Sequence, residues 1–287
     1  MSHQMARFPR RVQTSNQFAQ RIFTMTFSRI SVTTGAIARI VLNRPDKLNS
    51  FDEAMVLELH RAIDQIEADR HARVLVITGA GRAFCAGQDL ADPAMQAVDG
   101  KQPDIGNLVE RLVKPLVMRL QNLHVPTVAA VNGLAAGGGA GLALACDLVV
   151  AARSAYFLQA FSKIGLTPDT GSTWFLSQRV GTARTMGLTM LADKLPAAKA
   201  AEWGLIWDVL DDAEFAVGVD ALVERLASMP TKALVRTRQL VQAANGHSLE
   251  QQLSMEATTI REMGWSKDYA EGVLAFSEKR EARFTGE

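Results

Sequence analysis

The most informative chemical feature of this chain is a pair of isolated carboxylates. Between Glu110 and Asp193 it carries only two acidic side chains, Asp147 and Asp169. Asp169 follows a proline and precedes Thr-Gly-Ser within otherwise apolar sequence. Because removal from water raises the pKa of a carboxyl group, an acid in such surroundings is a candidate for proton transfer. A lone acid can move a proton between two atoms, whereas chemistry that needs two acids would require a partner.

Both acids also have structural interpretations. Asp169, between a proline and a glycine, could simply cap the helix that follows it. Asp147 stands at the start of an expected strand, where a structural hydrogen-bonding role is the stronger interpretation. Proton transfer is therefore the working hypothesis for Asp169 only.

Two glycine-containing turns provide a second chemical element. Residues 84–90 read Phe-Cys-Ala-Gly-Gln-Asp-Leu, and residues 131–141 form an uncharged, glycine-dense run. Each turn is expected to follow a buried strand and to open a helix, which leaves backbone N–H groups free at the positive end of the helix dipole. Two such groups directed at one point would form an oxyanion hole for an enolate or alkoxide. Close packing of helix on sheet is the alternative, and neither turn has the spacing of a nucleotide-binding fingerprint.

The elements that would position these groups follow an α/β pattern. Alternating or uniformly apolar runs predict strands at 27–32, 36–42, 74–78, 127–131 and 147–152. A capping-box pattern at Ser50 and Glu53 predicts the start of a helix. Further helices are expected over 105–123, over 138–145 and, interrupted at Pro196 and Pro230, from residue 171 to the end. Residues 91–106 have no clear period and are expected to form a loop.

Three regions are expected along the chain. Residues 1–25 are rich in arginine and belong to a stretch, 1–45, without any acidic residue. An organelle transit peptide or an upstream start codon would look like this, and we expect a disordered, dispensable extension. The α/β core should cover 26–220 and a helical region 221–287.

Bulk composition excludes several function classes. The 287 residues have a formal net charge of +1, which gives no general attraction to nucleic acid or to acidic membranes. No apolar run approaches the roughly 18 residues of a membrane span. Two cysteines are too few for a disulfide framework and fit a reducing compartment, so a cytoplasmic location is expected.

Three motifs in order resemble the enoyl-CoA hydratase/isomerase, or crotonase, superfamily. They are Leu-Asn-Arg-Pro at 42–45, the turn at 84–90 and the run at 131–141, and the resemblance extends from about residue 26 to the C-terminus. It implies an α/β fold, the crotonase (ClpP-like) spiral of ββα units with a C-terminal helical trimerisation region. It also implies an acyl-CoA thioester substrate, a homotrimer or dimer of trimers, and no cofactor or metal, since coenzyme A is part of the substrate.

The same resemblance implies site residues. The thioester oxygen would lie between the backbone N–H groups of Gln88 and Gly138; the family's usual residue at position 88 is alanine, and the change keeps the backbone donor. Phe161 and Trp174 could flank an aromatic acyl group. Residues expected to bind the substrate or its coenzyme A portion, the last two often on a neighbouring subunit, are Lys47, Leu48, Ala86, Asp89, Leu90, Phe276 and Lys279.

Within the superfamily, the acids determine the reaction. Hydratases carry two glutamates at positions that align with Gly141 and Phe161 here, so both acids are missing and hydration is disfavoured. Asp169 aligns with the aspartate of the acyl-CoA isomerases. Residues 160–169, with Thr173, Trp174 and 202–207, resemble the isomerases that convert the ring-1,2-epoxide of phenylacetyl-CoA to its oxepin, some of which also shift enoyl-CoA double bonds.

An isomerase is therefore the favoured function, and two alternatives remain. The first is a hydratase or hydrolase that uses Asp169 with water. The second is a non-catalytic scaffold that binds acyl-CoA or RNA. RNA binding would need a basic helix, whereas the expected helix over 51–70 carries six acidic residues against two arginines.

Overall fold

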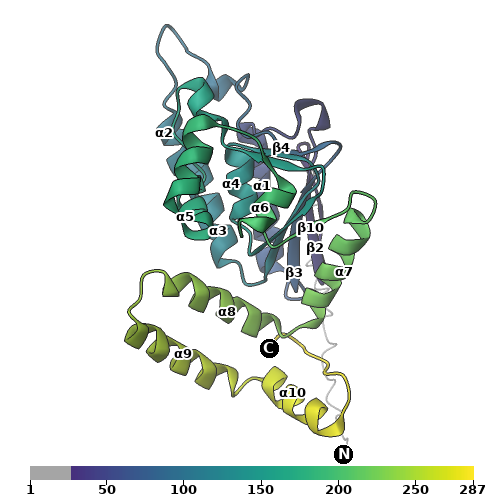
Figure 1. The fold of residues 1–287 in the computed structure, drawn as a ribbon. Helices are drawn as coiled ribbons and strands as arrows, with labels where there is room; N and C mark the ends of the chain where they lie inside the picture. Colours follow the sequence, from purple (N-terminus) through teal and green to yellow (C-terminus); the bar gives the residue numbers. More distant parts are fainter. Residues whose placement is uncertain (1–26) are drawn as a thin grey trace, which may run out of the picture.

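A six-stranded sheet forms the centre of the computed structural model, which describes residues 27–287 (Figure 1). Its strand order is β1-β2-β3-β5-β7-β10, and every neighbouring pair is parallel except β1 with β2. The strands are β1 (Ile30–Thr33), β2 (Ile37–Leu42), β3 (Val74–Gly79), β5 (Thr127–Val131), β7 (Leu148–Ala152) and β10 (Asp208–Leu210).

A smaller sheet is built from short strands in the order β4-β6-β8-β9. These are β4 (Ala83–Cys85), β6 (Leu134–Ala136), β8 (Tyr156–Leu158) and β9 (Leu195–Pro196). The chain passes three times from the large sheet to the small one, along β3 and β4, β5 and β6, and β7 and β8. This repetition confirms the expected spiral of β-strand pairs and helices.

The strands expected from apolar runs are present because their side chains are buried on both faces. All of β5 and nearly all of β3 are buried, as in parallel sheets covered by helices. The first expected strand is shorter than 27–32 and begins at Ile30. The short strands β4, β6, β8, β9 and β10 were not expected, because two or three residues carry no recognisable alternation.

Helices cover the sheets (Figure 1). In the α/β region they are α1 (Glu53–Ala68), α2 (Ile105–Leu108), α3 (Lys114–Asn122), α4 (Gly138–Leu144), α5 (Ser172–Leu191) and α6 (Ala197–Glu202). Short 3-10 turns are η1 (Pro45–Lys47), η2 (Pro93–Met95) and η4 (Ala160–Ile164), and η3 (Val109–Val113) is a π-helical turn between α2 and α3.

The start of α1 corrects the expected capping box. The N-cap is Asp52, whose carboxylate accepts a hydrogen bond from the N–H of Met55 at 2.8 Å, and not Ser50. Ser50 lies in the turn before the helix, where its carbonyl serves a different contact, described below. The sequence contains two overlapping cap patterns, and Asp is as good a cap as Ser.

The C-terminal part is helical, with α7 (Phe215–Ser228), α8 (Thr231–Ala244), α9 (Leu249–Met263) and α10 (Lys267–Glu278). Helix α7 packs against β2, β3 and β7, while α8, α9 and α10 extend away from the sheets (Figure 1). The expected boundary at 220/221 falls within α7. The expected extension over 1–25 lies outside the described residues.

Asp147 links the core to the C-terminal helices, in agreement with its structural interpretation. Its carboxylate accepts a hydrogen bond from the N–H of Thr127 at 2.8 Å and one from the guanidinium of Arg238 in α8 at 3.0 Å. Both partners of this ion pair are largely buried. A search of residues 27–287 finds no helix with the length and apolarity needed to cross a membrane.

Candidate active site

A cavity of about 190 Å³ brings the chemically distinctive segments together. The 84–90 turn, the glycine run, η4 and the loop before α5 each contribute to its wall. Apolar side chains from Phe51 before α1, from Leu90 and Met95, and from the α2–η3 segment complete the lining. The lining residues are Phe51, Ala86, Gly87, Gln88, Leu90, Met95, Ile105, Leu108, Val109, Val113, Gly137, Gly138, Ala160, Phe161, Lys163, Ile164, Leu166, Asp169 and Thr170.

Asp169 is the only carboxylate in this described wall, and its surroundings perturb it. Burial raises the pKa of Asp169 above its ordinary value, although hydrogen bonds from the hydroxyl of Thr170 and from its own N–H act in the opposite direction. The Thr170 hydroxyl donates to Oδ1 at 2.7 Å. A carboxylate that is accessible from a cavity and costly to ionise is suited to accept and return a proton.

The loop conformation directs Asp169 inward and rules out the capping alternative. Thr170 and Gly171 both have positive φ, at 52° and 73°, and the N–H of Ser172 donates to the Asp169 carbonyl at 2.9 Å. Helix α5 therefore begins at Ser172 with Gly171 as its N-cap and has no side-chain cap. The carboxylate of Asp169 therefore caps no helix and lines the cavity, with Thr170 as its hydrogen-bond donor.

Two backbone donors belong to the same cavity wall as that carboxylate. Gly138 is the first residue of α4, so its N–H has no intrahelical partner. A Cβ atom added at Gly138 would lie 3.6 Å from Oδ1 of Asp169, so Gly138 and this carboxylate are near neighbours in the cavity wall. Among residues 27–287, no acceptor is paired with the N–H of Gln88.

Gly87 allows the two turns to approach each other. Its φ is 90°, and a Cβ atom there would lie 2.8 Å from the carbonyl oxygen of Ala136 and 3.4 Å from the nitrogen of Gly138. Only glycine fits this conformation and this distance. The 84–90 turn opens no helix, contrary to expectation, because the chain continues through a loop and α2 begins only at Ile105. The Gln88 donor thus depends on strand-like contacts and not on a helix dipole.

Neither position that aligns with a hydratase glutamate offers an acid to the cavity: Gly141 has no room for a side chain, and position 161 holds a buried phenylalanine. A Cβ atom at Gly141 would lie only 2.7 Å from Cβ of Thr170 and 2.8 Å from its carbonyl oxygen. Phe161 is 7% exposed, and its ring edge lies against Gly137. Besides Asp169, Lys163 is the only charged side chain in the described wall of the cavity.

Three of the residues expected to bind substrate, namely Ala86, Leu90 and Phe161, line the cavity together with Asp169, Gln88 and Gly138. Lys47 and Leu48 do not line it, but they lie beside it, since the Leu48 carbonyl accepts a hydrogen bond from Ala86 at 3.0 Å. Asp89 does not line the cavity, and its carboxylate accepts a hydrogen bond from the Arg44 guanidinium at 2.8 Å.

Trp174 is not brought to the cavity. Residues 172, 175 and 176 form the buried face of α5, so the 3.6-residue period turns Trp174 outward, where it is 46% exposed and contacts Phe175 edge-on. The side chain lines a separate groove beside Trp207. Trp174 thus does not line the cavity that contains Asp169, and contact with an aromatic acyl group stays a prediction.

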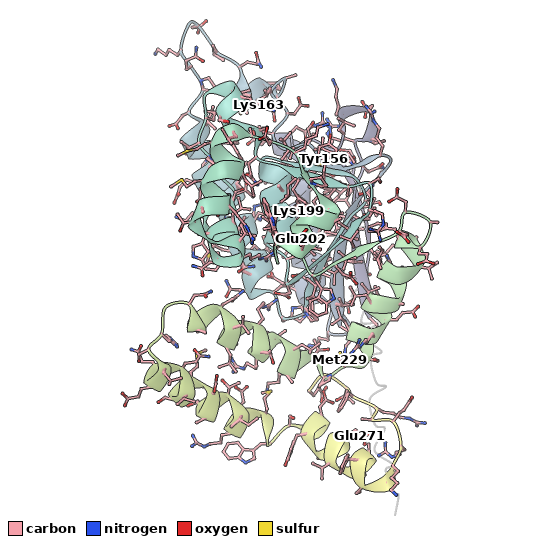
Figure 2. The ribbon with its side chains drawn as sticks, in the orientation of Figure 1. Tyr156, Lys163, Lys199, Glu202, Met229 and Glu271 are labelled. Atoms are coloured by element: carbon pink, nitrogen blue, oxygen red, sulfur yellow. The ribbon has the colours of Figure 1, made fainter. Side chains whose placement is uncertain are left out.

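Phe276 and Lys279 belong to α10 and its C-cap, far from the cavity of the same chain. Figure 2 shows this separation, with Lys163 of the cavity wall and Glu271 of α10 at opposite ends of the molecule. Phe276 is 87% exposed. Contact with coenzyme A from this segment would have to occur in another subunit, as the sequence-based expectation stated.

Sequence reasoning missed much of the apolar wall, including Phe51 and the α2–η3 segment. Residues 105–123 are interrupted by η3, whose π-helical turn presents Val109 and Val113 to the cavity. Pro115 lies two residues after the end of η3 and has no N–H to donate within a regular helix, which explains the irregular turn. That proline was the available signal. The described residues contain no cluster of His, Cys, Asp and Glu that could hold a metal ion.

Replacing Asp169 with Asn should stabilise the folded protein at neutral pH. The folded pKa of Asp169 lies above that of the unfolded chain, about 3.9, so ionisation is less favourable in the folded state. This penalty is absent below the unfolded pKa and grows as the pH rises through the folded pKa. We expect the melting temperature of Asp169→Asn to exceed that of wild type at pH 8, with a difference that narrows toward pH 4. Equal melting temperatures at pH 8 would contradict the assigned burial penalty.

Comparisons with known proteins agree with this site. The family model described as enoyl-CoA hydratase/isomerase matches residues 32–287. The chain is 48% identical to a 1,2-epoxyphenylacetyl-CoA isomerase of Escherichia coli, over 87% of this chain and 95% of that protein. It is 42% identical to a probable enoyl-CoA hydratase of Rhodobacter capsulatus, over 90% and 97%.

Solved structures show the same relationship. An enoyl-CoA hydratase of Bacillus anthracis superposes with a TM-score of 0.84 at 31% identity, covering 91% of this chain and all of that one. A putative enoyl-CoA hydratase of Streptomyces coelicolor has a TM-score of 0.85 at 31% identity, covering 95% and all of that chain. The matched length, the identities and the shared fold all show that the chain belongs to the enoyl-CoA hydratase/isomerase family.

Proposed function

We propose that the protein is an acyl-CoA isomerase in which Asp169 moves a proton within the acyl group. The observation that carries this proposal is the single carboxylate in the described cavity wall, with both hydratase positions filled by Gly141 and Phe161. Its preferred substrate is the ring-1,2-epoxide of phenylacetyl-CoA, converted to the oxepin. The 48% identity to an isomerase of that name and the apolar wall of the cavity support this choice.

In the proposed reaction, the thioester oxygen accepts hydrogen bonds from the N–H groups of Gln88 and Gly138. Asp169 takes a proton from the carbon next to the thioester, and the electrons of that C–H bond move toward the carbonyl oxygen as the enolate forms. The two backbone donors stabilise the negative charge at that oxygen. The carboxylic acid then returns the proton at a carbon further along the acyl group. With the ring epoxide, the C–C bond that joins the two epoxide carbons also breaks, and its electron pair becomes part of the double bonds of the seven-membered oxepin ring, so no atom is gained or lost. No electron leaves the acyl group, so the reaction needs no redox cofactor.

Hydration is the second candidate, because several relatives bear the name enoyl-CoA hydratase. Asp169 would then have to activate water and also supply the proton for the neighbouring carbon. One acid can perform both steps only in succession, which makes hydration the slower reaction in this site.

A panel of acyl-CoA thioesters tests the proposal. Purified protein would be incubated with 3-enoyl, 2-enoyl and ring-epoxide phenylacetyl-CoA, and the products followed by mass and ultraviolet absorbance. We expect new absorbance without a change in mass. A mass gain of one water with 2-enoyl-CoA, at a rate above that of isomerisation, would assign a hydratase.

We also propose that the protein acts in the cytoplasm as a homotrimer or a dimer of trimers. Support for self-association comes from the exposed apolar side chains of the C-terminal helical region, which include Ile260 in α9, Trp265 in the turn that follows and Phe276 in α10, at 71%, 82% and 87% exposed. Such a concentration of apolar surface is typical of subunit contacts. Sedimentation of the purified protein would give the assembly mass directly.

A further inference from the structure

The backbone donor at Gln88 is held in place from one side by the segment before α1. The N–H of Phe51 donates to the carbonyl of Gly87, and the N–H of Asp89 donates to the carbonyl of Phe51, both at 2.7 Å. Phe51 and Gln88 therefore form a parallel bridge. In such a bridge the flanking residues 87 and 89 bond to the partner, so the N–H of Gln88 points to the opposite side. Gln88 is itself one of the residues that line the cavity.

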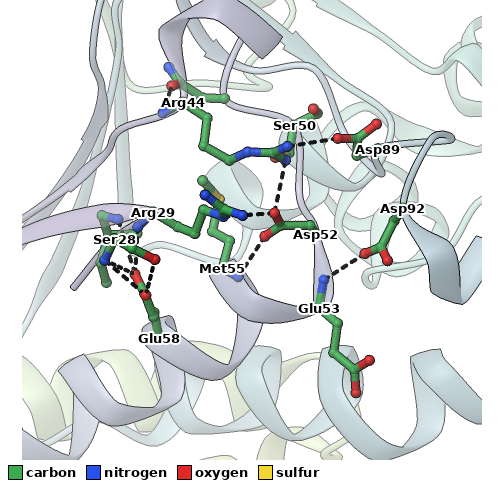
Figure 3. Close-up of polar contacts among 12 residues, drawn as sticks. Ser28, Arg29, Arg44, Ser50, Asp52, Glu53, Met55, Glu58, Asp89 and Asp92 are labelled. Atoms are coloured by element: carbon green, nitrogen blue, oxygen red, sulfur yellow. Dashed lines mark hydrogen bonds and ion pairs between the residues drawn. The ribbon is translucent and has the colours of Figure 1, made fainter. Parts of the chain in front are cut away.

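An ion-pair network secures this segment against the 84–90 turn (Figure 3). Arg44 donates one hydrogen bond to the carbonyl of Ser50 and another to the carboxylate of Asp89, both at 2.8 Å. The same guanidinium lies 3.4 Å from the carboxylate of Asp52, the N-cap of α1. The side chains of Arg44, Asp52 and Asp89 are each 13% exposed, so solvent screens these contacts weakly.

None of these three side chains lines the cavity. Arg44 connects the two segments of the bridge, because it bonds the residue before Phe51 and the residue after Gln88. We name Arg44, Asp52 and Asp89 the Arg44 clasp. Loss of the clasp would leave no side-chain contact at the bridge itself, whose two backbone hydrogen bonds would then be supported only by the contacts of Leu48 with Ala86 and of Asn49 with Ala83.

We propose that the Arg44 clasp is a positioning device that fixes the direction of the Gln88 N–H toward the thioester oxygen, with Arg44 and Asp89 as positioning residues. This inference rests on the proposed function in one respect, because it assumes that the Gln88 N–H donates to the thioester oxygen. Oxyanion donors act through preorganised geometry, and small misplacements reduce turnover strongly. The clasp thus gives Asp89 a role different from the coenzyme A contact expected for it.

The test uses a substrate analogue whose absorbance reports hydrogen bonds to the thioester oxygen. In 4-(dimethylamino)cinnamoyl-CoA an electron-donating amine is conjugated with the carbonyl, so donors to that oxygen shift the absorbance to longer wavelength. Wild type, Asp89→Asn and Arg44→Lys would be compared at saturating analogue. The matched control is Asp147→Asn, which weakens a similarly buried Asp–Arg pair outside the cavity. Circular dichroism would establish that each variant is folded.

Wild type and Asp147→Asn should show the full red shift. Asp89→Asn and Arg44→Lys should bind the analogue with a clearly smaller shift and lose about 10- to 100-fold in kcat on the isomerase substrate, with KM changed less than about threefold. A full shift and unchanged kcat in both clasp variants would overturn the inference while leaving the proposed function intact. A wild type that binds the analogue without any shift would overturn the oxyanion hole itself, and the clasp with it.

Discussion

Asp169→Asn is expected to lower kcat for isomerisation by about 10²- to 10⁴-fold, the range that positioned general acids and bases contribute. Asn has nearly the same shape and can still accept the hydrogen bond of Thr170, which reaches Oδ1 at 2.7 Å in the wild type. What it cannot do is accept a proton from carbon. Binding of the acyl-CoA should change little, because the backbone donors and the apolar wall remain, so the loss should appear in kcat and not in KM.

The matched control is Asp193→Asn, the same chemical change at an exposed carboxylate outside the described cavity wall. It should retain wild-type turnover. In wild type, kcat/KM should fall as the pH drops through the pKa of Asp169, which burial raises above its ordinary value. The residual activity of Asp169→Asn should lack this acidic limb. Turnover within a few-fold of wild type in Asp169→Asn would remove the proton-transfer role.

The pattern of the chain predicts the parts of the site whose chemistry is local. A carboxylate surrounded by apolar residues is visible at Asp169, and glycine turns after apolar strands are visible near Gly87 and Gly138. These features depend on residue type alone. The structure places all three segments around one cavity.

The remaining features depend on how distant segments pack. Trp174 lies five residues after Asp169, and only the phase of α5 shows that it faces outward. Asp89 follows the oxyanion turn directly, yet its carboxylate is paired with Arg44, which is 45 residues away. Phe51 reaches the cavity because of its bridge to Gln88. The apolar periodicity of a single segment does not show which distant residues it will contact.

The same distinction applies to the fold. β3, β5 and β7 are predictable because burial on both faces makes them continuous apolar runs. The strands of the small sheet are only two or three residues long, and their pairing is determined by the way β4, β6 and β8 lie side by side. Their existence follows from the spiral as a whole.

Thr170 occupies the space beside Gly141, so a glutamate at position 141, as in the hydratases, would not fit there. Gly141→Ala should destabilise the protein by about 1–3 kcal/mol, since the new Cβ would lie 2.7–2.9 Å from Cβ, the carbonyl oxygen and Cγ2 of Thr170. Gly141→Glu should cost more and should not acquire hydratase activity, because it adds a buried charge to the same overlap. Chemical denaturation would measure both changes, and mass analysis with 2-enoyl-CoA would measure hydration.

Two further variants separate the overlap from the general effect of replacing a helical glycine. Gly187→Ala in α5, where an added Cβ meets nothing within 4 Å, should be stabilising by about 0.5–1 kcal/mol. Thr170→Gly should recover part of the loss in Gly141→Ala, since it removes two of the three overlapping atoms and suits the positive φ of 52° at that position. A Gly141→Ala protein as stable as wild type would show that Thr170 yields readily. In that case the absence of a glutamate would be a matter of the residue type at position 141. The loop that contains Thr170 and directs Asp169 into the cavity would then not exclude a side chain there.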